Sequence, residues 1–155
     1  MKPRHFLTLL DLSSNELNHL MKRAVLMKAS LHSRSSTSLM AGMTMAMLFE
    51  KTSTRTRVLF EVAASQFGGH ALLLAPGDSQ FSRGEPLSDP ARIISSMADL
   101  IVMRTSAHDR VMTMATHSRV PVINAMSDHF HPCQLLADVL TFIRSEEHTS
   151  ELQSQ

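Results

Sequence analysis

Four short apolar runs, separated by segments with helical spacing, dominate the pattern of this 155-residue chain. Each run has the length of a buried strand, and none alternates strictly between apolar and polar residues, which is typical of parallel strands covered on both faces. Strands that alternate with helices indicate a parallel sheet. We therefore predict an α/β fold, a three-layer sandwich whose four-stranded parallel sheet has helices on both faces. The predicted strands cover residues 43–49, 71–75, 100–103 and 120–123, and the predicted helices cover about 13–30, 54–67, 90–98, 108–117 and 132–143.

Two of the helix starts carry capping signals. Ser13, followed three residues later by Glu16, predicts a capping box. Asp89 stands directly before Pro90, so we expect Asp89 to be the N-cap and Pro90 the first helical residue. The polar stretch 76–88 ahead of that helix is rich in Gly, Pro and Ser, and loops of this length are often functional or mobile.

The composition argues against several classes of protein. Hydrophobic residues make up 43% of the chain, yet no apolar run is long enough to span a bilayer, and the basic N-terminus lacks the features of a secretion signal. A single cysteine, Cys133, leaves no internal disulfide framework and suits a reducing compartment. The net charge of +1 and the scarcity of aromatic residues give no case for nucleic acid. We expect a cytoplasmic domain without a membrane or nucleic-acid partner.

Hydroxyls and cations crowd at the junction between the first predicted strand and the next helix. Ligands of open parallel sheets bind beyond the carboxyl ends of the strands, where helix N-termini favour anions. Here the hydroxyls of Ser53, Thr54 and Thr56 add donors, and Arg55 adds a planar fork suited to phosphate. Arg57, two residues on, projects elsewhere. On this pattern alone, a phosphate site and a capped helix with solvated arginines both stay open.

Two further polar residues follow the third and fourth predicted strands. Arg104 ends the third strand, and His131 precedes Pro132, a residue suited to the first position of a helix. Both are therefore expected at the same sheet edge as Ser53, where a neutral imidazole could donate to a substrate oxygen. A capping or surface histidine is the alternative for His131. A zinc site at His129, His131 and Cys133 is weakly supported, and Cys133 is better interpreted as a small buried residue than as a nucleophile.

The last residues differ in character from the rest. Apolar periodicity stops at Ile143, and residues 144–154 match the translation of a widely used sequencing-adapter oligonucleotide. We interpret residues 1–143 as the domain and residues 144–155 as a non-native read-through tail, disordered or irregular. A genuine acidic tail is the alternative.

Four stretches together resemble a known family: RHFLTLLDLSSNEL, FEKTSTRTRVLFEVA, DPARIISSMADLIVMRT and VPVINAMSDHFHPCQLLADVLT. They resemble the carbamoyltransferases over residues 3–143, and specifically the carbamoyl-phosphate-binding domain of the ornithine carbamoyltransferases. Glu50, three residues before Ser53, and the loop that bears Gln80 are similar to the ornithine rather than the aspartate branch. Pro90 departs from the threonine common in the family, and we expect no loss of function from it.

The resemblance implies transfer of the carbamoyl group from carbamoyl phosphate to the δ-amine of L-ornithine, in arginine biosynthesis, with no metal or cofactor. It implies that Gln134 binds the carbamoyl nitrogen and that Gln80 serves the site of a neighbouring subunit in a homotrimer or a multiple of trimers. The phosphate would be held by Ser53, Thr54, Arg55 and Thr56. The groups acting on the carbamoyl oxygen would be Arg104 and His131 together with Arg55 and Thr56, and the catalytic residues would be Arg55, Arg104 and His131.

Family members continue into a second domain that binds ornithine, and its motifs are missing here. We therefore expect this chain alone to bind carbamoyl phosphate without useful transfer to ornithine. Three alternatives stay open: a relative with another amine acceptor (putrescine, acetylornithine or aspartate), a non-catalytic phosphate-binding module, and a fragment too unstable to persist.

Overall fold

The computed structural model describes residues 2–32, 38–74 and 86–153. Its centre is a parallel sheet of four strands in the order β2-β1-β3-β4, which confirms the predicted sheet. β4 is displaced relative to the prediction, because it begins two residues later and continues to Met126. The strands are β1 (Thr44–Phe49), β2 (His70–Leu74), β3 (Leu100–Arg104) and β4 (Val122–Met126).

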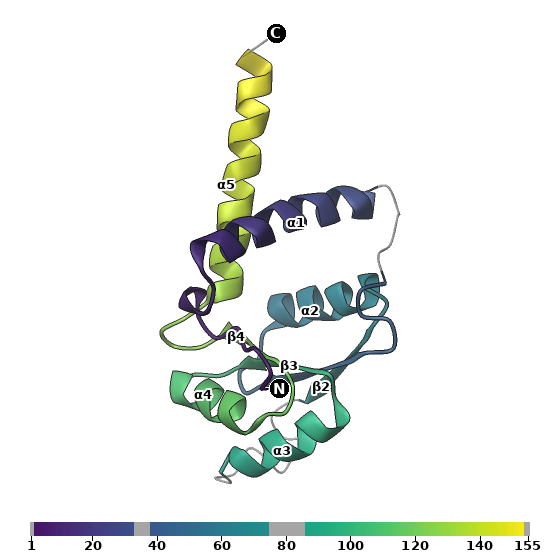
Figure 1. Ribbon diagram of the computed structural model, residues 1–155, viewed down its shortest axis with the longest axis vertical. Helices are drawn as coiled ribbons and strands as arrows, with labels where there is room; N and C mark the ends of the chain where they lie inside the picture. Colours follow the sequence, from purple (N-terminus) through teal and green to yellow (C-terminus); the bar gives the residue numbers. More distant parts are fainter. Residues whose placement is uncertain (1, 33–37, 75–85, 154–155) are drawn as a thin grey trace.

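Helices cover both faces of the sheet, as predicted (Figure 1). α3 and α4 lie on one face, α2 lies on the other, and α1 lies beyond α2. No helix in the described ranges is long and apolar enough to cross a membrane. The helices are α1 (Ser14–His32), α2 (Thr54–Gln66), α3 (Ser88–Met97), α4 (His108–His117) and α5 (Pro132–Gln153), and a short 3-10 turn, η1 (Leu9–Asp11), precedes α1.

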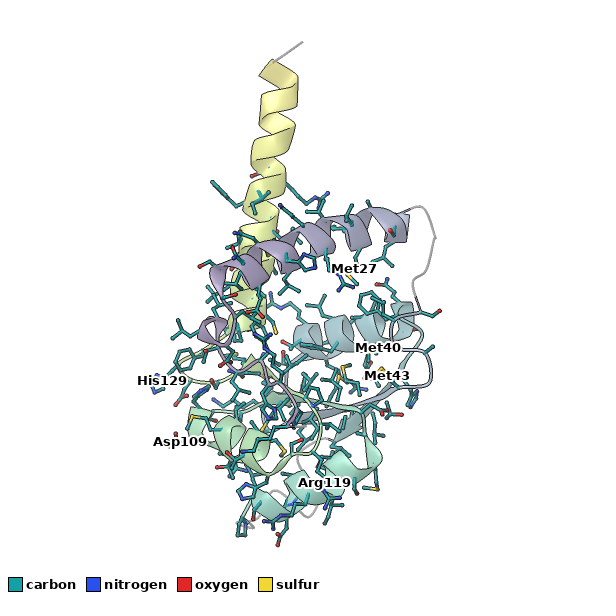
Figure 2. The ribbon with its side chains drawn as sticks, in the orientation of Figure 1. Met27, Met40, Met43, Asp109, Arg119 and His129 are labelled. Carbon is teal, nitrogen blue, oxygen red and sulfur yellow. The ribbon has the colours of Figure 1, made fainter. Side chains whose placement is uncertain are left out.

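The two faces of β1 explain its unbroken apolar run. Ala46 and Leu48 belong to a buried cluster with α3 and α4, whereas Met45, Met47 and Phe49 belong to a second cluster with α2. Side chains fill the space on both sides of the sheet (Figure 2). A strand with apolar partners on both faces has no reason to alternate with polar residues.

The helix starts agree with the capping signals at one position and differ at another. The Ser13 hydroxyl accepts from the Glu16 N–H at 3.3 Å, and the Glu16 carboxylate accepts from the Ser13 N–H at 2.8 Å, which confirms the capping box. The prediction that Asp89 caps α3 is wrong. Leu87 occupies the N-cap position, because its buried side chain belongs to the core, and Asp89 lies in the first turn. Pro90 is tolerated there because the first turn of a helix has N–H groups without helical partners.

α5 is longer than predicted. It does not end at Ile143 but continues to Gln153, so residues 144–153 are helical rather than irregular. These residues include no Gly or Pro that would stop a helix, and extending an existing helix is easier than starting one. The extension projects away from the rest of the domain (Figure 1). Its origin as a read-through tail stays a prediction.

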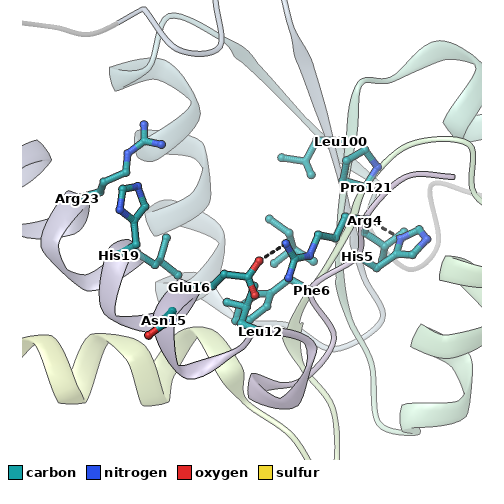
Figure 3. Close-up of a pocket in the computed structure, with 13 residues that line it drawn as sticks. Arg4, His5, Phe6, Leu12, Asn15, Glu16, His19, Arg23, Leu100 and Pro121 are labelled. Carbon is teal, nitrogen blue, oxygen red and sulfur yellow. Dashed lines mark hydrogen bonds and ion pairs between the residues drawn. The ribbon is translucent and has the colours of Figure 1, made fainter. Parts of the chain in front are cut away.

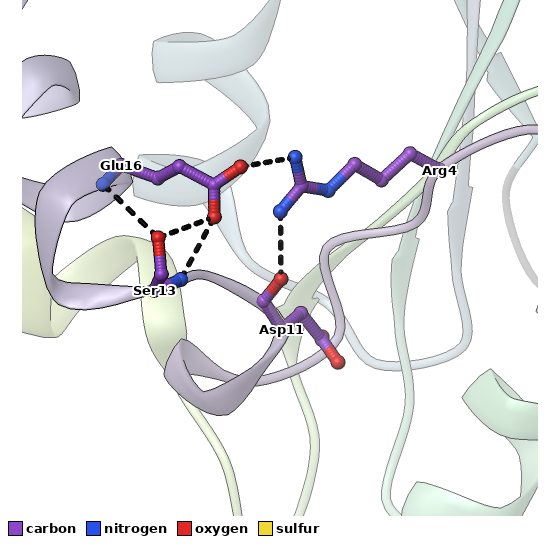
Figure 4. A network of polar contacts seen from close by, with 4 residues as sticks. All are labelled: Arg4, Asp11, Ser13 and Glu16. Carbon is purple, nitrogen blue, oxygen red and sulfur yellow. Dashed lines mark hydrogen bonds and ion pairs between the residues drawn. The ribbon is translucent and has the colours of Figure 1, made fainter.

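The N-terminal segment is attached to β4 and α1 by contacts that the sequence pattern did not indicate. Phe6 forms a parallel bridge to Ile123, extending the sheet beyond β4. The Arg4 guanidinium bonds the Glu16 carboxylate at 2.5 Å and the Asp11 carbonyl at 3.0 Å (Figure 4). Hydrogen bonds from Arg4 and from the Ser13 N–H and hydroxyl lower the pKa of Glu16 to about 2. A mainly apolar cavity of about 580 Å³ lies between this segment, α1 and the sheet (Figure 3).

Two isoleucines provide a matched test of the core. Ile101 in β3 is fully buried, whereas Ile93 in α3 is 51% exposed. Ile101→Ala should lower the free energy of unfolding by about 2–5 kcal/mol, because it removes buried methyl groups and leaves a cavity. Ile93→Ala should change it by no more than about 0.5 kcal/mol. Urea denaturation followed by circular dichroism measures both, and equal effects would contradict this assignment of the core.

Candidate active site

Three neighbouring strands deliver the predicted site residues to one edge of the sheet. In the parallel register, Phe49 pairs with Arg104, and Arg104 pairs with Met126. The segments that follow β1, β3 and β4 therefore begin side by side. This edge is where ligands of open parallel sheets bind.

The N-terminus of α2 contributes hydroxyls and unpaired N–H groups. Ser53 is the N-cap, and its hydroxyl accepts from the Thr56 N–H at 3.4 Å and donates to the Thr56 hydroxyl at 2.9 Å. Thr54 and Arg55 follow in the exposed first turn. Arg57 bonds Glu61 one turn further on, at 2.9 Å. The first turn thus presents Thr54 and Arg55 to an incoming anion, while Arg57 already has a carboxylate partner.

A cavity of about 370 Å³ lies against this helix start. It is bounded by the end of β1 and the first two turns of α2, and its lining includes Ser53, Thr54 and two cations, Lys51 and Arg57. Glu61, the only carboxylate among the described residues of the lining, is paired with Arg57. The hydroxyls, the ammonium group of Lys51 and the helix N-terminus together favour a negatively charged group in this cavity.

Arg104 connects β3 to this helix start. Its Nη1 donates to the Thr56 hydroxyl at 2.9 Å, although the two residues are 48 positions apart. Its Nε is buried and has no partner among the described residues. An unpaired buried N–H is costly, so Arg104 holds a donor ready for an acceptor that enters the site.

His131 is held neutral beside Arg104. Burial lowers its pKa below the ordinary value of 6.5, the positive charge of Arg104 lowers it further, and Asp138 opposes these effects. Its Nδ1 is buried and has no partner in the described part of the chain. A neutral imidazole can donate a hydrogen bond without bringing another charge into the site.

Gln134 does not converge fully with the other predicted residues. It lies on the exposed side of the first turn of α5, and its Nε2 donates to the Asp138 carboxylate at 2.7 Å. Gln80 lies outside the described residues. Hydrogen bonds join Ser53, Thr56 and Arg104, and His131 lies close enough to Arg104 for that charge to lower its pKa. Thr54 and Arg55 lie at the same helix start, and Ser53 and Thr54 are the predicted site residues that line the cavity there.

The metal and nucleophile alternatives for the second motif receive no support. His129 is exposed and lies 3.7 Å from the Asp128 carboxylate, at the periphery of the molecule (Figure 2). Burial raises the pKa of the Cys133 thiol to about 11, so Cys133 is protonated near neutral pH. Within residues 2–32, 38–74 and 86–153, no group of His, Cys, Asp or Glu is placed to hold a metal ion.

Sequence reasoning missed a polar network directly behind the site. The Glu50 carboxylate accepts from the Arg110 guanidinium at 2.8 Å and 2.5 Å, and it also bonds the Thr105 hydroxyl. From the sequence, Glu50 was interpreted only as a residue whose spacing from Ser53 resembles the ornithine branch. Arg110 carries no local signal for such a contact, because it lies 60 residues away and only the β1–β3 pairing brings the two segments together.

The loop that carries His131 is also held by contacts that the sequence did not reveal. The buried Asn124 amide donates to the Leu7 carbonyl at 2.9 Å and to the Ser127 hydroxyl at 3.2 Å. The His108 ring lies 2.9 Å from the Ser127 hydroxyl and packs on Phe130. These contacts fix the turn between β4 and α5, and with it the place of His131.

The state of His131 gives a testable pH dependence. The folded protein keeps His131 neutral where the unfolded chain would protonate it, so the free energy of unfolding should fall as pH decreases through 6.5. An NMR titration should give a His131 midpoint below 6.5, with the resonance assigned by its loss in His131→Gln. Arg104→Met should raise the midpoint by removing a neighbouring charge. A wild-type midpoint at or above 6.5 would contradict the placement.

Comparison with known proteins matches this geometry to one family. Residues 4–144 match the carbamoyl-P binding domain of aspartate/ornithine carbamoyltransferase. The ornithine carbamoyltransferase of Psychrobacter sp. (strain PRwf-1) is 54% identical over 142 residues, which are 92% of this chain and 46% of that protein. The chain spans about half the length of the curated relatives it matches.

Comparison with solved structures indicates the same family. The ornithine carbamoyltransferase from Pyrococcus furiosus has a TM-score of 0.89 and 42% identity, covering 93% of this chain and 46% of that one. The catalytic subunit of M. jannaschii aspartate transcarbamoylase has a TM-score of 0.84 and 32% identity, covering 93% of this chain and 48% of that one. The chain therefore belongs to the aspartate/ornithine carbamoyltransferase family, and it contains the carbamoyl-phosphate-binding domain of that family.

Proposed function

We propose that this domain binds carbamoyl phosphate at the carboxyl edge of its sheet, and that the whole protein transfers the carbamoyl group to L-ornithine, giving L-citrulline and phosphate. The observation that carries the proposal is the contact between Arg104 at the end of β3 and Thr56 in the first turn of α2, at 2.9 Å. It joins an arginine to a hydroxyl-rich helix N-terminus, and both favour a phosphate ester.

The phosphate half of the ligand belongs at the start of α2. Free N–H groups and the positive end of the helix dipole attract its charge. The hydroxyls of Ser53, Thr54 and Thr56 supply short hydrogen bonds, and the exposed Arg55 supplies a fork that matches two phosphate oxygens. This arrangement also stabilises the phosphate as it leaves, because its negative charge increases when the bond to the carbamoyl carbon breaks.

The carbamoyl half faces Arg104 and His131. Attack by an amine places negative charge on the carbamoyl oxygen, and donors already in place stabilise that charge. The unpaired Nε of Arg104 and the neutral ring of His131 are such donors, with Arg55 and Thr56 beside them. Each well-placed donor contributes about 3 kcal/mol to lowering the barrier.

Gln134 supplies an acceptor for the carbamoyl nitrogen. Its Nε2 donates to Asp138, which leaves the amide oxygen as the free end of the side chain. The carbamoyl NH2 group needs an acceptor rather than a donor, so this orientation fits the proposed role.

Ornithine as the acceptor rests on resemblance. The curated relative reported above is named an ornithine carbamoyltransferase, and Glu50 has the spacing of that branch. In this proposal the domain holds the electrophile, and ornithine is bound by a part of the whole protein that the described residues do not include. The domain on its own is therefore expected to bind carbamoyl phosphate without useful transfer.

We also propose that the site is completed in a homotrimer, with Gln80 reaching a neighbouring copy. α2 exposes three apolar side chains beside the cavity, those of Val58, Leu59 and Val62. Such an apolar surface is consistent with its being covered by a neighbouring copy of the protein. A single cysteine suits the cytoplasm, the compartment we propose for a role in arginine biosynthesis.

Ligand-induced stabilisation tests the binding site. Carbamoyl phosphate at a hundredfold over its dissociation constant should add about 2.7 kcal/mol to the free energy of unfolding. This should appear as a rise in Tm by differential scanning fluorimetry, and Arg55→Ala should abolish it. Arg119→Ala is the matched control, because Arg119 is exposed and precedes β4, at the opposite edge of the sheet. Absence of any shift in the wild-type protein would reject the preformed site, and a full shift in Arg55→Ala would reject the role of Arg55.

A further inference from the structure

The N-terminal segment, residues 4–10, is bonded to the strand that leads into the turn before α5. The Phe6 N–H donates to the Val122 carbonyl at 2.8 Å, and the Phe6 carbonyl accepts from the Asn124 N–H at 2.9 Å. The His5 Nδ1 accepts from the Val122 N–H at 3.1 Å. These hydrogen bonds hold the segment against β4.

The side chain of Asn124 joins this segment to the turn itself. It is fully buried, and its Nδ2 lies 2.9 Å from the Leu7 carbonyl, 3.2 Å from the Ser127 hydroxyl and 3.4 Å from the Phe130 carbonyl. Carbonyl oxygens cannot donate, so the NH2 group and not the amide oxygen must face them. Asn124 therefore connects Leu7 with the residue directly before His131.

The Phe130 carbonyl is the acceptor on which the turn closes. It also accepts from the Ser127 N–H at 2.9 Å and from the Ser127 hydroxyl at 3.3 Å. The next residue, His131, accepts through its carbonyl from the Leu135 N–H of α5 at 3.2 Å. A shift of the Phe130 carbonyl would therefore move His131 with it.

The N-terminal segment also lies beside His131. A cavity of about 130 Å³ is lined by residues from both parts of the chain: Thr8, Leu9 and Leu10 of the segment, residues 129–132 of the turn and the start of α5, and Leu135. Separation of the segment from the turn would open this space to water. Water around the imidazole would relieve the burial that keeps it neutral.

We propose that the N-terminal segment is a positioning element of the active site, and that Asn124 is the positioning residue that joins it to the turn bearing His131. In this proposal neither contacts the substrate, and both act by holding the imidazole at the carboxyl edge of the sheet. The inference rests on the proposed function, because it concerns the imidazole that would face the carbamoyl group.

An NMR titration of His131 without ligand tests the proposal. Burial and then the charge of Arg104 lower the pKa of His131, while Asp138 opposes both. Phe6→Pro removes an N–H that holds the segment to β4, and Asn124→Leu removes the NH2 group at similar volume. Each should raise the midpoint toward 6.5 by exposing the ring. Phe6→Leu, the matched control, keeps the N–H and should leave the midpoint unchanged.

A double variant tests whether the two changes break the same connection. Phe6→Pro/Asn124→Leu should have a midpoint no higher than that of the more affected single variant, because the segment and the turn are already separated. Additive shifts would show that the two residues act independently and would overturn the proposal. An unchanged midpoint in either single variant would overturn it as well.

A purely structural role gives a different pattern. Ile94→Ala removes a buried side chain of α3, so it should lower Tm without moving the His131 midpoint. If the midpoint shifted there as much as in Asn124→Leu, loss of stability alone would explain the shift and the proposal would fail. If Asn124→Leu does not fold, Phe6→Pro carries the test, and a wild-type midpoint in that variant would count against the proposal.

Binding of carbamoyl phosphate separates this inference from the proposed function. By isothermal titration calorimetry, Phe6→Pro and Asn124→Leu should weaken binding about threefold to tenfold, the effect of losing one hydrogen bond. A wild-type protein that binds no carbamoyl phosphate rejects the proposed function, while the His131 midpoints still decide whether the segment positions the ring. Wild-type affinity in both variants, with normal binding by the wild type, rejects the inference alone.

Discussion

The parallel pairing of β1 with β3 is the constraint on which the rest of the site depends. It sets Phe49 opposite Arg104, so the segment that opens α2 begins beside the last residue of β3. From that register follow the Thr56–Arg104 hydrogen bond, the Glu50–Arg104 backbone contact and the Glu50–Arg110 ion pair. A slip by one residue would turn every side chain of β1 to the opposite face and undo both buried clusters. The core and the site are therefore specified by the same pairing.

The charges at this edge are arranged so that the positive ones stay available. In the described part of the chain, Glu61, Glu50 and Asp138 are engaged by Arg57, Arg110 and Gln134, whereas the Arg104 Nε has no partner. His131 stays neutral because burial and the charge of Arg104 lower its pKa. Donors that are fixed before the ligand arrives need no rearrangement when charge develops, and this is the main source of electrostatic stabilisation in enzyme sites.

Much of the fold, and the edge of the sheet at which the site lies, could be predicted from the sequence because both rest on local signals. Apolar runs gave the strands, and the Ser13–Glu16 capping box was confirmed. The family resemblance rests on four stretches, three of which contain the end of a strand. The prediction that Arg104 and the start of α2 share one edge of the sheet is confirmed by the register and by the Arg104–Thr56 hydrogen bond.

The errors and omissions have physical causes of their own. The prediction that Asp89 caps α3 was wrong because the burial of Leu87 outweighed the local capping preference of Asp89. The end of α5 was misplaced because a loss of apolar periodicity does not stop a helix that lacks Gly or Pro. The contact of Glu50 with Arg110 joins residues 60 positions apart, and no local pattern encodes it. Long-range polar pairs follow from the fold, so they become visible only once the strands are paired.

The central claim is that carbamoyl phosphate binds at the carboxyl edge of the sheet, and the most direct test is to identify the amides whose resonances the ligand shifts. A titration of ¹⁵N-labelled protein with carbamoyl phosphate should shift the amides of Ser53 to Arg57 first, together with the Nε resonance of Arg104. These amides form the first turn of α2, and the Arg104 Nε has no partner among the described residues. Shifts concentrated instead on α1 and the N-terminal segment, around the apolar cavity, would contradict the claim.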